Sequence, residues 1–286
     1  MQVATIFGPA GVCDRAREEK VKTTVQFLDF VKNNSLDAFE YQCGRGVNIG
    51  EEKAILVGEA ARQRGITLSI HAPYYISLAS AEEQKRINSI DYILQSARAA
   101  KAMGAQRIVV HPGGIGKMQR QEAAALAKQT LAAAVRALDE NGLGDITVCP
   151  EVMGKINQLG HLEEIIDFCS LDERLIPCVD FGHYNSYTQG SLKTAADFEN
   201  VFDTLKNGIG EERTNKLHIH FSKIEYSKGG EVRHLTFEDS TFGPDPEILV
   251  NILAKECCNA VVICESAGTQ TDDAAFMKKL YEGAQK

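Results

Sequence analysis

The chain has 286 residues, of which 44% are hydrophobic and 24% are charged, and its formal net charge is −8. This composition is typical of a soluble globular protein, and the excess of acidic residues disfavours broad binding to nucleic-acid phosphates. The longest apolar stretches are far shorter than the ~20 residues that cross a bilayer, and residues 1–7 lack the pattern of a signal peptide. Eight cysteines without a CxxC pair favour a reduced protein of the cytoplasm.

Short runs of β-prone residues recur along the chain, and each is followed by a segment with helical periodicity. We predict strands near residues 3–7, 38–41, 67–70, 107–110, 146–149, 175–179, 216–219 and 260–264. Amphipathic helices are clearest over residues 82–103, 121–141 and 162–169. Strands about 29–44 residues apart that alternate with helices are typical of a (β/α)8 TIM barrel. Because no linker or block of charge divides the chain, we predict an α/β protein with a single TIM-barrel domain over residues 1–286.

Two of the predicted strand-to-helix loops are unusually long, namely residues 181–193 and 222–243. Loops longer than about 12–15 residues within a compact domain are usually functional or disordered. Both loops follow strands on the face where a barrel of this type carries its active site, so we expect both to contribute to function.

Six of the predicted strands end at a residue type that binds metal ions. In each case a run of apolar residues stops at a histidine or a carboxylate, and these are His71, His111, Glu151, Asp180, His220 and Glu265. The carboxyl ends of parallel strands form a ring in a barrel, so side chains far apart in sequence can converge on one metal cluster. Histidines with carboxylates suit Zn²⁺ or Mn²⁺, and a carboxylate such as Glu151 can bridge two ions about 3.5–4 Å apart. The sequence therefore predicts a metal site.

Each of these residues also has an ordinary structural interpretation. His71 and His111 precede proline-containing turns, and Asp180 is suited to cap the next helix. Glu151 and Glu265 are harder to explain without a cation, because ionised carboxylates beside core strands need compensating charge or donors.

The predicted seventh strand offers two histidines, His218 and His220, which lie two residues apart and therefore point to the same face. His220 matches the strand-end placement of the other ligands. We expect His218 to lie one layer deeper, where it would fill the barrel.

Short motifs surround the candidate ligands in a fixed order. They are HAPYYI at 71–76, VHPG at 110–113, EVMG at 151–154, DFGH at 180–183, HFSK at 220–223, RH at 233–234 and CES at 264–266. In this order, across most of the chain, they resemble the endonuclease IV type of apurinic/apyrimidinic endonuclease (AP endonuclease family 2), within the xylose-isomerase-like barrel superfamily.

The resemblance implies a trinuclear zinc site. One zinc would be bound by His71, His111 and Glu151, and a second by Glu151, Asp180, His220 and Glu265. The third would be bound by His183 and His234, with an aspartate that the family carries two residues before the second histidine. This chain has Val232 at that position, so Glu231 would have to substitute through a shift of the loop. The resemblance therefore implies two or three zinc ions, the third bound more weakly.

The leading hypothesis is that the protein hydrolyses the DNA backbone at abasic sites, where a metal-bound hydroxide attacks phosphorus and Glu151 and Glu265 are the catalytic residues. As in the family, Tyr74 would insert at the lesion. Lys223, which stands where the family usually has aspartate, would contact the substrate. Basic residues on predicted loops that could also meet phosphates are Lys117, Arg120, Lys155 and Lys228.

The alternative is a divalent-metal sugar or sugar-phosphate isomerase or epimerase of the same superfamily. Such an enzyme needs one cation to hold two vicinal oxygens and two glutamates to exchange a proton. His71 and His111 favour the nuclease, because a one-metal isomerase does not need both, whereas the acidic balance and Val232 favour the isomerase. The expected substrate is thus abasic DNA or a small sugar. A third hypothesis is a barrel that binds metal without catalysing either reaction.

Overall fold

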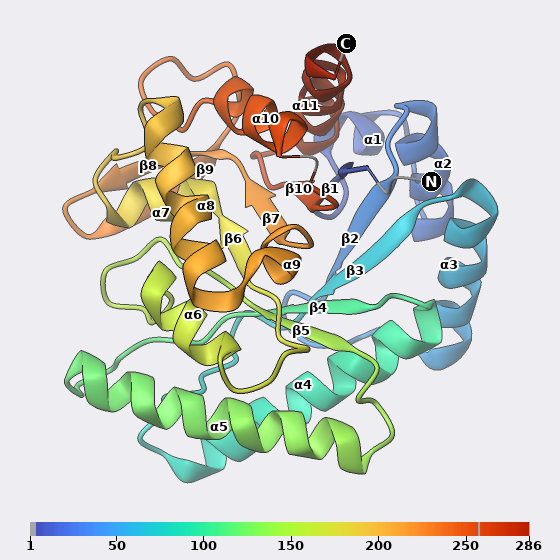
Figure 1. Ribbon diagram of the computed structural model, residues 1–286. Coiled ribbons are helices and arrows are strands. Elements are labelled where there is room, and N and C mark those ends of the chain that lie inside the picture. The colour runs from blue at the N-terminus through green and yellow to red at the C-terminus, as the bar shows by residue number, and fades with distance from the viewer. Residues whose placement is uncertain (1–3, 257, 286) are drawn as a thin grey trace.

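The computed structural model describes residues 4–256 and 258–285, so the first residue of the predicted strand 3–7 and Cys257 lie outside the described residues. Parallel strands form two four-stranded sheets, in the orders β1-β10-β7-β6 and β2-β3-β4-β5. Parallel bridges between Ala10 and Glu40 and between Glu151 and Cys178 join the two sheets at both seams. The strands thereby close into a barrel, and helices surround it (Figure 1). The predicted α/β TIM barrel is confirmed.

The barrel strands are β1 (Ile6–Pro9), β2 (Ala38–Gln42), β3 (Thr67–His71), β4 (Arg107–Val110), β5 (Thr147–Pro150), β6 (Cys178–Asp180), β7 (His218–Phe221) and β10 (Val261–Cys264). The larger helices are α2 (Thr24–Asn33), α3 (Glu51–Arg64), α4 (Glu83–Met103), α5 (Arg120–Glu140), α6 (Leu162–Cys169), α8 (Ala195–Ile209), α10 (Pro246–Lys255) and α11 (Gln270–Ala284). Short helices are α1 (Asp14–Glu18), α7 (Phe181–Tyr187) and α9 (Glu211–Thr214). The three helices predicted most clearly correspond to α4, α5 and α6.

Helix α5 shows how the outer layer is fixed. Its buried residues recur every three or four positions, which forms one apolar stripe toward the barrel. Ala123, Ala127 and Ala134 contribute small side chains to this stripe, and Leu131 and Leu138 fill the remaining space. The other face carries the charged residues. The same pattern places each helix against its strands and leaves the strand ends free to carry the site.

The two long segments expected to be loops contain regular structure of their own. Residues 181–187 form α7, whose first backbone amides are capped by Asp180 through a 2.6 Å hydrogen bond from His183 N to Asp180 Oδ1. Residues 223–235 form an antiparallel hairpin of β8 (Lys223–Ser227) and β9 (Gly230–Leu235). Figure 1 shows this hairpin beside α7, at the left of the molecule. Helix and hairpin together extend the wall of the barrel mouth.

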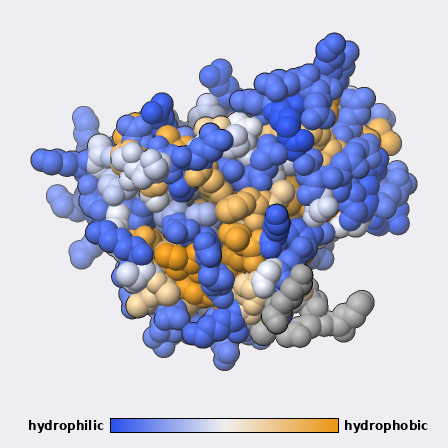
Figure 2. All heavy atoms as spheres, turned by 90° about the horizontal axis from the view of Figure 1, so that it is seen from above, coloured by the Kyte–Doolittle hydropathy of each residue, from blue (hydrophilic) through white to orange (hydrophobic). Residues whose placement is uncertain are grey.

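Figure 2, seen from above Figure 1, shows hydrophilic side chains over most of this face and hydrophobic ones gathered near its middle. No helix in residues 4–256 or 258–285 combines the length and the apolar character needed to cross a membrane.

Candidate metal centre

The strand ends bring the predicted ligands together around Glu151, which follows β5 and is fully buried. His71, the last residue of β3, places its Nε2 atom 3.3 Å from Glu151 Oε2. His111, directly after β4, places its Nε2 atom 2.9 Å from the same oxygen. Ligand atoms of these three residues lie within 4.8 Å of one another, so they could hold one metal ion.

A second group shares Glu151 and lies deeper in the barrel. His220 Nδ1 is 3.2 Å from Glu151 Oε1 and 3.6 Å from Glu265 Oε1. Asp180, at the end of β6, completes a set whose ligand atoms again lie within 4.8 Å of one another. We refer to both sets together as the central group, whose members are His71, His111, Glu151, Asp180, His220 and Glu265.

A third set, which we call the outer group, consists of His183, Glu231 and His234. His183 lies in the first turn of α7, and its Nε2 atom is 3.4 Å from Glu231 Oε2. His234 is on β9, and its ring contacts that of His183 edge-on, with 5.4 Å between the ring centres. Glu231 thus lies where it could take the place of the aspartate that this chain lacks, through a local shift of the hairpin.

The register of the hairpin explains how Glu231 reaches this position. Arg233 pairs with Glu225, but the next residue of β8, Tyr226, pairs with Glu231, so Val232 is an extra residue in a β-bulge. In a regular strand Glu231 and His234, three residues apart, would point to opposite faces. The bulge puts both on the same side and leaves Val232 with 51% of its surface exposed.

Hydrogen bonds fix which ring nitrogen faces the site in His71, His183 and His234. The Nδ1 atom of His71 is 2.8 Å from the Ala72 carbonyl oxygen, and that of His183 is 3.0 Å from the Val152 carbonyl oxygen. Carbonyl oxygens only accept, so both Nδ1 atoms carry a proton, and each Nε2 atom would offer its lone pair to a cation once it is deprotonated. His234 Nδ1 is likewise occupied, at 2.8 Å from the hydroxyl of Ser222.

The charges of the site stabilise one another. Burial lowers the pKa of His71, but the hydrogen bond and charge of Glu151 outweigh burial and raise this pKa to about 9. Burial also opposes protonation of His183, yet Asp180 and Glu151 raise its pKa to about 10. Burial acts to raise the pKa of Glu151, but His111 and the other histidines hold it well below its ordinary value. Because protons and a cation compete for these ligands, we expect cation affinity to increase as the pH rises.

The donor chemistry fits a divalent cation. Asp180 Oδ2 is buried and, among the described residues, has no hydrogen-bond partner. Burial raises the pKa of Asp180, and the carboxylate of Glu265 adds to this effect against the opposing charge of His183. A buried carboxylate beside two others needs a cation to remain ionised. Imidazole nitrogens with carboxylate oxygens suit Zn²⁺ or Mn²⁺.

Glu40 is not among the predicted site residues, but it lies in the middle of β2 and is fully buried. One of its oxygens, Oε2, is 2.9 Å from His218 Nε2 and accepts a 2.9 Å hydrogen bond from Ser69 Oγ. Its other oxygen is 3.0 Å from His220 Nε2. His218 therefore lies one layer below His220, as expected. A carboxylate within a predicted core strand was the signal that could have identified Glu40.

Cys178 could join His218 and His220 as a further set of metal-binding atoms. Burial, however, raises the pKa of the Cys178 thiol well above its ordinary value. A neutral thiol is a poor metal ligand, so the central group is the stronger candidate.

The two residues predicted to contact substrate differ in their positions. Tyr74 is 53% exposed and lines the cavity over the ligands. Lys223 does not line this cavity, and its ammonium donates hydrogen bonds to the carbonyl oxygens of Phe237 and Asp239. This corrects the expectation for Lys223, which holds the segment after β9 instead of facing the ligands. Lys155, in contrast, does line the cavity.

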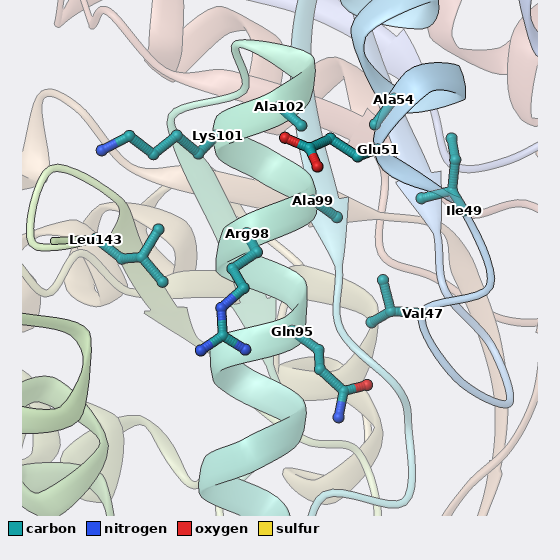
Figure 3. Close-up of a pocket in the computed structure, with 10 residues that line it drawn as sticks. All are labelled: Val47, Ile49, Glu51, Ala54, Gln95, Arg98, Ala99, Lys101, Ala102 and Leu143. Atoms are coloured by element: carbon teal, nitrogen blue, oxygen red, sulfur yellow. The ribbon is translucent and has the colours of Figure 1, made fainter. Parts of the chain in front are cut away.

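The cavity over the ligands has a volume of about 320 Å³, enough for a sugar or one nucleotide residue. A larger cavity of about 600 Å³ lies outside the barrel, between the segment before α3 and helix α4 (Figure 3). Its two basic residues are already paired, since Arg98 donates to Asn141 at 2.9 Å and Lys101 donates to Gly142 O at 2.8 Å. The ligand-bearing cavity is thus the better site for chemistry.

Comparisons with known proteins agree with this architecture. The family model described as xylose isomerase-like TIM barrel matches residues 28–280. An uncharacterized protein of Methanocaldococcus jannaschii is 31% identical over 277 residues, 97% of each chain. A probable endonuclease 4 of Staphylococcus carnosus is 28% identical over 176 residues, which cover 58% of this chain and 56% of that relative. The match therefore spans about half the length of the endonuclease 4 relative.

Solved structures of two kinds share the fold. A D-tagatose 3-epimerase-like protein has a TM-score of 0.73 at 20% identity, with 98% of this chain and 97% of the other covered. Endonuclease IV from Thermus thermophilus has a TM-score of 0.66 at 17% identity, with 98% of each chain covered. At these identities the likeness shows the fold alone.

Proposed function

The chain belongs to the xylose isomerase-like TIM barrel family, and we propose that within this family it is a metal-dependent phosphodiesterase that hydrolyses the DNA backbone at abasic sites. The observation that carries the proposal is the presence of the outer group and of His71 and His111 beside the tetrad of Glu151, Asp180, His220 and Glu265. One cation would need only the tetrad. Adjoining sets that share a carboxylate suit a cluster that contacts several oxygens of one phosphate. The partial match to endonuclease 4 relatives supports DNA as substrate.

Bound divalent cations would supply Lewis-acid stabilisation of the phosphate and of the leaving oxygen. Glu151 belongs to both sets of the central group and would therefore help to hold two of these cations. Both glutamates line the cavity, but the side chain of Glu265 is 15% exposed, whereas that of Glu151 has no exposed surface. The carboxylate of Glu265 would therefore accept the proton of the attacking water. A P–O bond to the water oxygen would form as the P–O bond to the leaving sugar oxygen breaks. The leaving alkoxide would take up a proton from solvent to become a hydroxyl, and Glu265 would release its own proton to solvent.

The rim of the cavity offers contacts for the rest of the substrate. The hydroxyl of Tyr75 donates a 2.6 Å hydrogen bond to Arg45 O, and its ring packs edge-on against Tyr92 with 5.0 Å between ring centres. This fixed ring supports Tyr74, whose ring centre is 5.5 Å away and which stays exposed. Tyr74 would occupy the gap left by the missing base, and Lys155 would bind a phosphate next to it.

The test uses the zinc-reconstituted full chain and a duplex oligonucleotide that carries one tetrahydrofuran abasic analogue. We expect cleavage at the analogue and none in the same duplex with an intact nucleotide. Stacking on an aromatic ring contributes about 1–3 kcal/mol, so Tyr74→Ala should raise KM for the abasic duplex about tenfold. The same variant should leave hydrolysis of a small diester, bis-p-nitrophenyl phosphate, unchanged. A protein that holds its ions and leaves the abasic duplex intact contradicts the proposal.

The second candidate, a sugar isomerase or epimerase, is favoured by one feature of the central group. The tetrad alone completes a site for one cation, and it includes two glutamates, which proton exchange at a sugar carbon requires. The same preparation can be incubated with ketohexoses in D₂O, where exchange at the carbon next to the carbonyl is followed by NMR. Deuterium exchange without DNA cleavage would establish this candidate in place of the first.

A further inference from the structure

The centre of the barrel holds a polar network directly below the candidate ligands. Glu40 is fully buried, and its Oε2 atom accepts hydrogen bonds from Ser69 Oγ and His218 Nε2, both at 2.9 Å. Gln42 Nε2 donates to Oε1 at 3.2 Å. These partners come from three different strands, β2, β3 and β7, so the position of the carboxylate is set by the barrel itself. The Oε1 atom is also the one that lies 3.0 Å from His220 Nε2.

The ring of His220 is oriented differently from the other candidate ligands. His71 and His183 direct Nε2 into the site, and their Nδ1 atoms meet backbone carbonyls. His220 directs Nδ1 toward Glu151 Oε1 at 3.2 Å, and its Nε2 faces a carboxylate. A histidine that offers Nδ1 to a cation must carry its proton on Nε2. A carboxylate acceptor for that proton fixes the ring and makes the nitrogen that faces the metal a stronger donor than a carbonyl would.

We propose that Glu40 is a positioning residue of the metal centre, which holds the proton of His220 on Nε2 so that Nδ1 binds the cation of the tetrad. His220 Nε2 and Glu40 Oε1 are close enough to bond but are not aligned, and among the described residues Nε2 has no other hydrogen-bond partner. A rotation of the ring about its Cβ–Cγ bond would bring the pair into line. The inference rests on the metal centre and holds for either reaction considered above.

The decisive variant is Glu40→Gln, which keeps the volume and removes the charge. Loss of such a partner typically weakens metal binding by about 10–100-fold, and we expect this loss for one cation per chain. Zinc affinity is measured on metal-stripped full-length protein by competition with a chelator. Co²⁺ absorption spectra of the same proteins report the ligand field at the site. A Glu40 that only supports the fold would lower the unfolding temperature of the variant and leave both readouts unchanged.

Ser69→Ala is the matched control, because it removes one hydrogen bond to Glu40 Oε2 and leaves the charge and the Oε1 atom in place. We expect its zinc affinity to change by less than about threefold. Equal affinity in wild type and Glu40→Gln overturns the role of Glu40 and leaves the metal centre standing. A wild type that binds no zinc overturns the metal centre, and the role of Glu40 with it.

NMR of the wild type keeps the inference testable even if Glu40→Gln does not fold. In ¹¹³Cd²⁺-loaded, ¹⁵N-labelled protein we expect the His220 ring to couple to cadmium through Nδ1 and to carry a proton on Nε2. Coupling through Nε2 would show that the ring faces the other way and would overturn the proposal.

Discussion

The central and outer groups are built on different parts of the fold. Members of the central group stand within one residue of the ends of barrel strands, where ladder hydrogen bonds between neighbours set each position. Members of the outer group stand on a short helix and on a hairpin outside the barrel. The hairpin is held against the segment after β5 by two backbone hydrogen bonds, from Glu231 N to Gly154 O at 2.9 Å and from Ile156 N to Gly229 O at 3.1 Å.

This difference determines which ligand positions are fixed by the fold and which can be shifted. A barrel strand cannot shift by one residue without turning its core side chains outward, so the central ligands are fixed along with the fold. The hairpin can take up an extra residue, and the bulge at Val232 is such a change. We infer that the central group determines whether the protein binds metal, and that the outer group adjusts how many cations act on the substrate.

The largest effect is expected from Glu151→Gln. Its carboxylate is shared by both sets of the central group, and the amide cannot supply the charge for two cations. Lewis-acid stabilisation is worth several kcal/mol, and each ~1.4 kcal/mol is tenfold in rate. The turnover of the active substrate should therefore decrease about a thousandfold or more, while circular dichroism shows an intact fold. A variant with most of its activity would remove Glu151 from the centre of the mechanism.

Glu231→Gln should affect the outer group alone. The loss of its charged ligand should weaken one zinc ion about tenfold or more and leave the central ions in place. Zinc per chain, measured by elemental analysis after dialysis, should decrease by one. Glu225→Gln is the control on the same hairpin, because Glu225 pairs with Arg233 at 2.7 Å and belongs to neither group. If both variants keep the same zinc content as the wild type, Glu231 is not a ligand.

The same contrast explains what the sequence could predict. The strands, the clearest helices and the meeting of the strand-end residues follow from periodicity and from the geometry of parallel barrels. The role of Glu231 depends on the pairing of β9 with Tyr226, a contact that no local pattern around Val232 reveals. The position of the Lys223 ammonium cannot be predicted locally for a similar reason, because the carbonyls that it meets come from a segment more than ten residues away.

Gly154→Ala should weaken the outer group without removing any ligand. A Cβ atom at Gly154 would lie 2.7 Å from Glu231 Cβ and 2.8 Å from His183 Cδ2, so the two side chains must move. Misplaced ligands bind less tightly, and we expect a loss of about 3–10-fold in zinc affinity for this set only. Gly229→Ala is the matched control, since the nearest atom to its Cβ is Ser227 Oγ at an ordinary 3.7 Å. Equal losses in both variants would point to general damage to the hairpin.

The smallest effect is expected from Val232→Asp, although the family resemblance places an aspartate here. Val232 is the extra residue of the bulge and is half exposed, so the new carboxylate would point to solvent while Glu231 keeps its place beside His183. Zinc titration of the metal-stripped variant should give outer-group affinity within about threefold of wild type, because an exposed charge is strongly screened. Deletion of Val232 tests whether Glu231 is a ligand by removing the extra residue of the bulge. Without the extra residue, Glu231 and the histidine are two positions apart on a regular strand, share a face, and should still bind the cation. A clear gain in affinity from Val232→Asp would mean that the bulge does not persist in solution and that Glu231 does not complete the site.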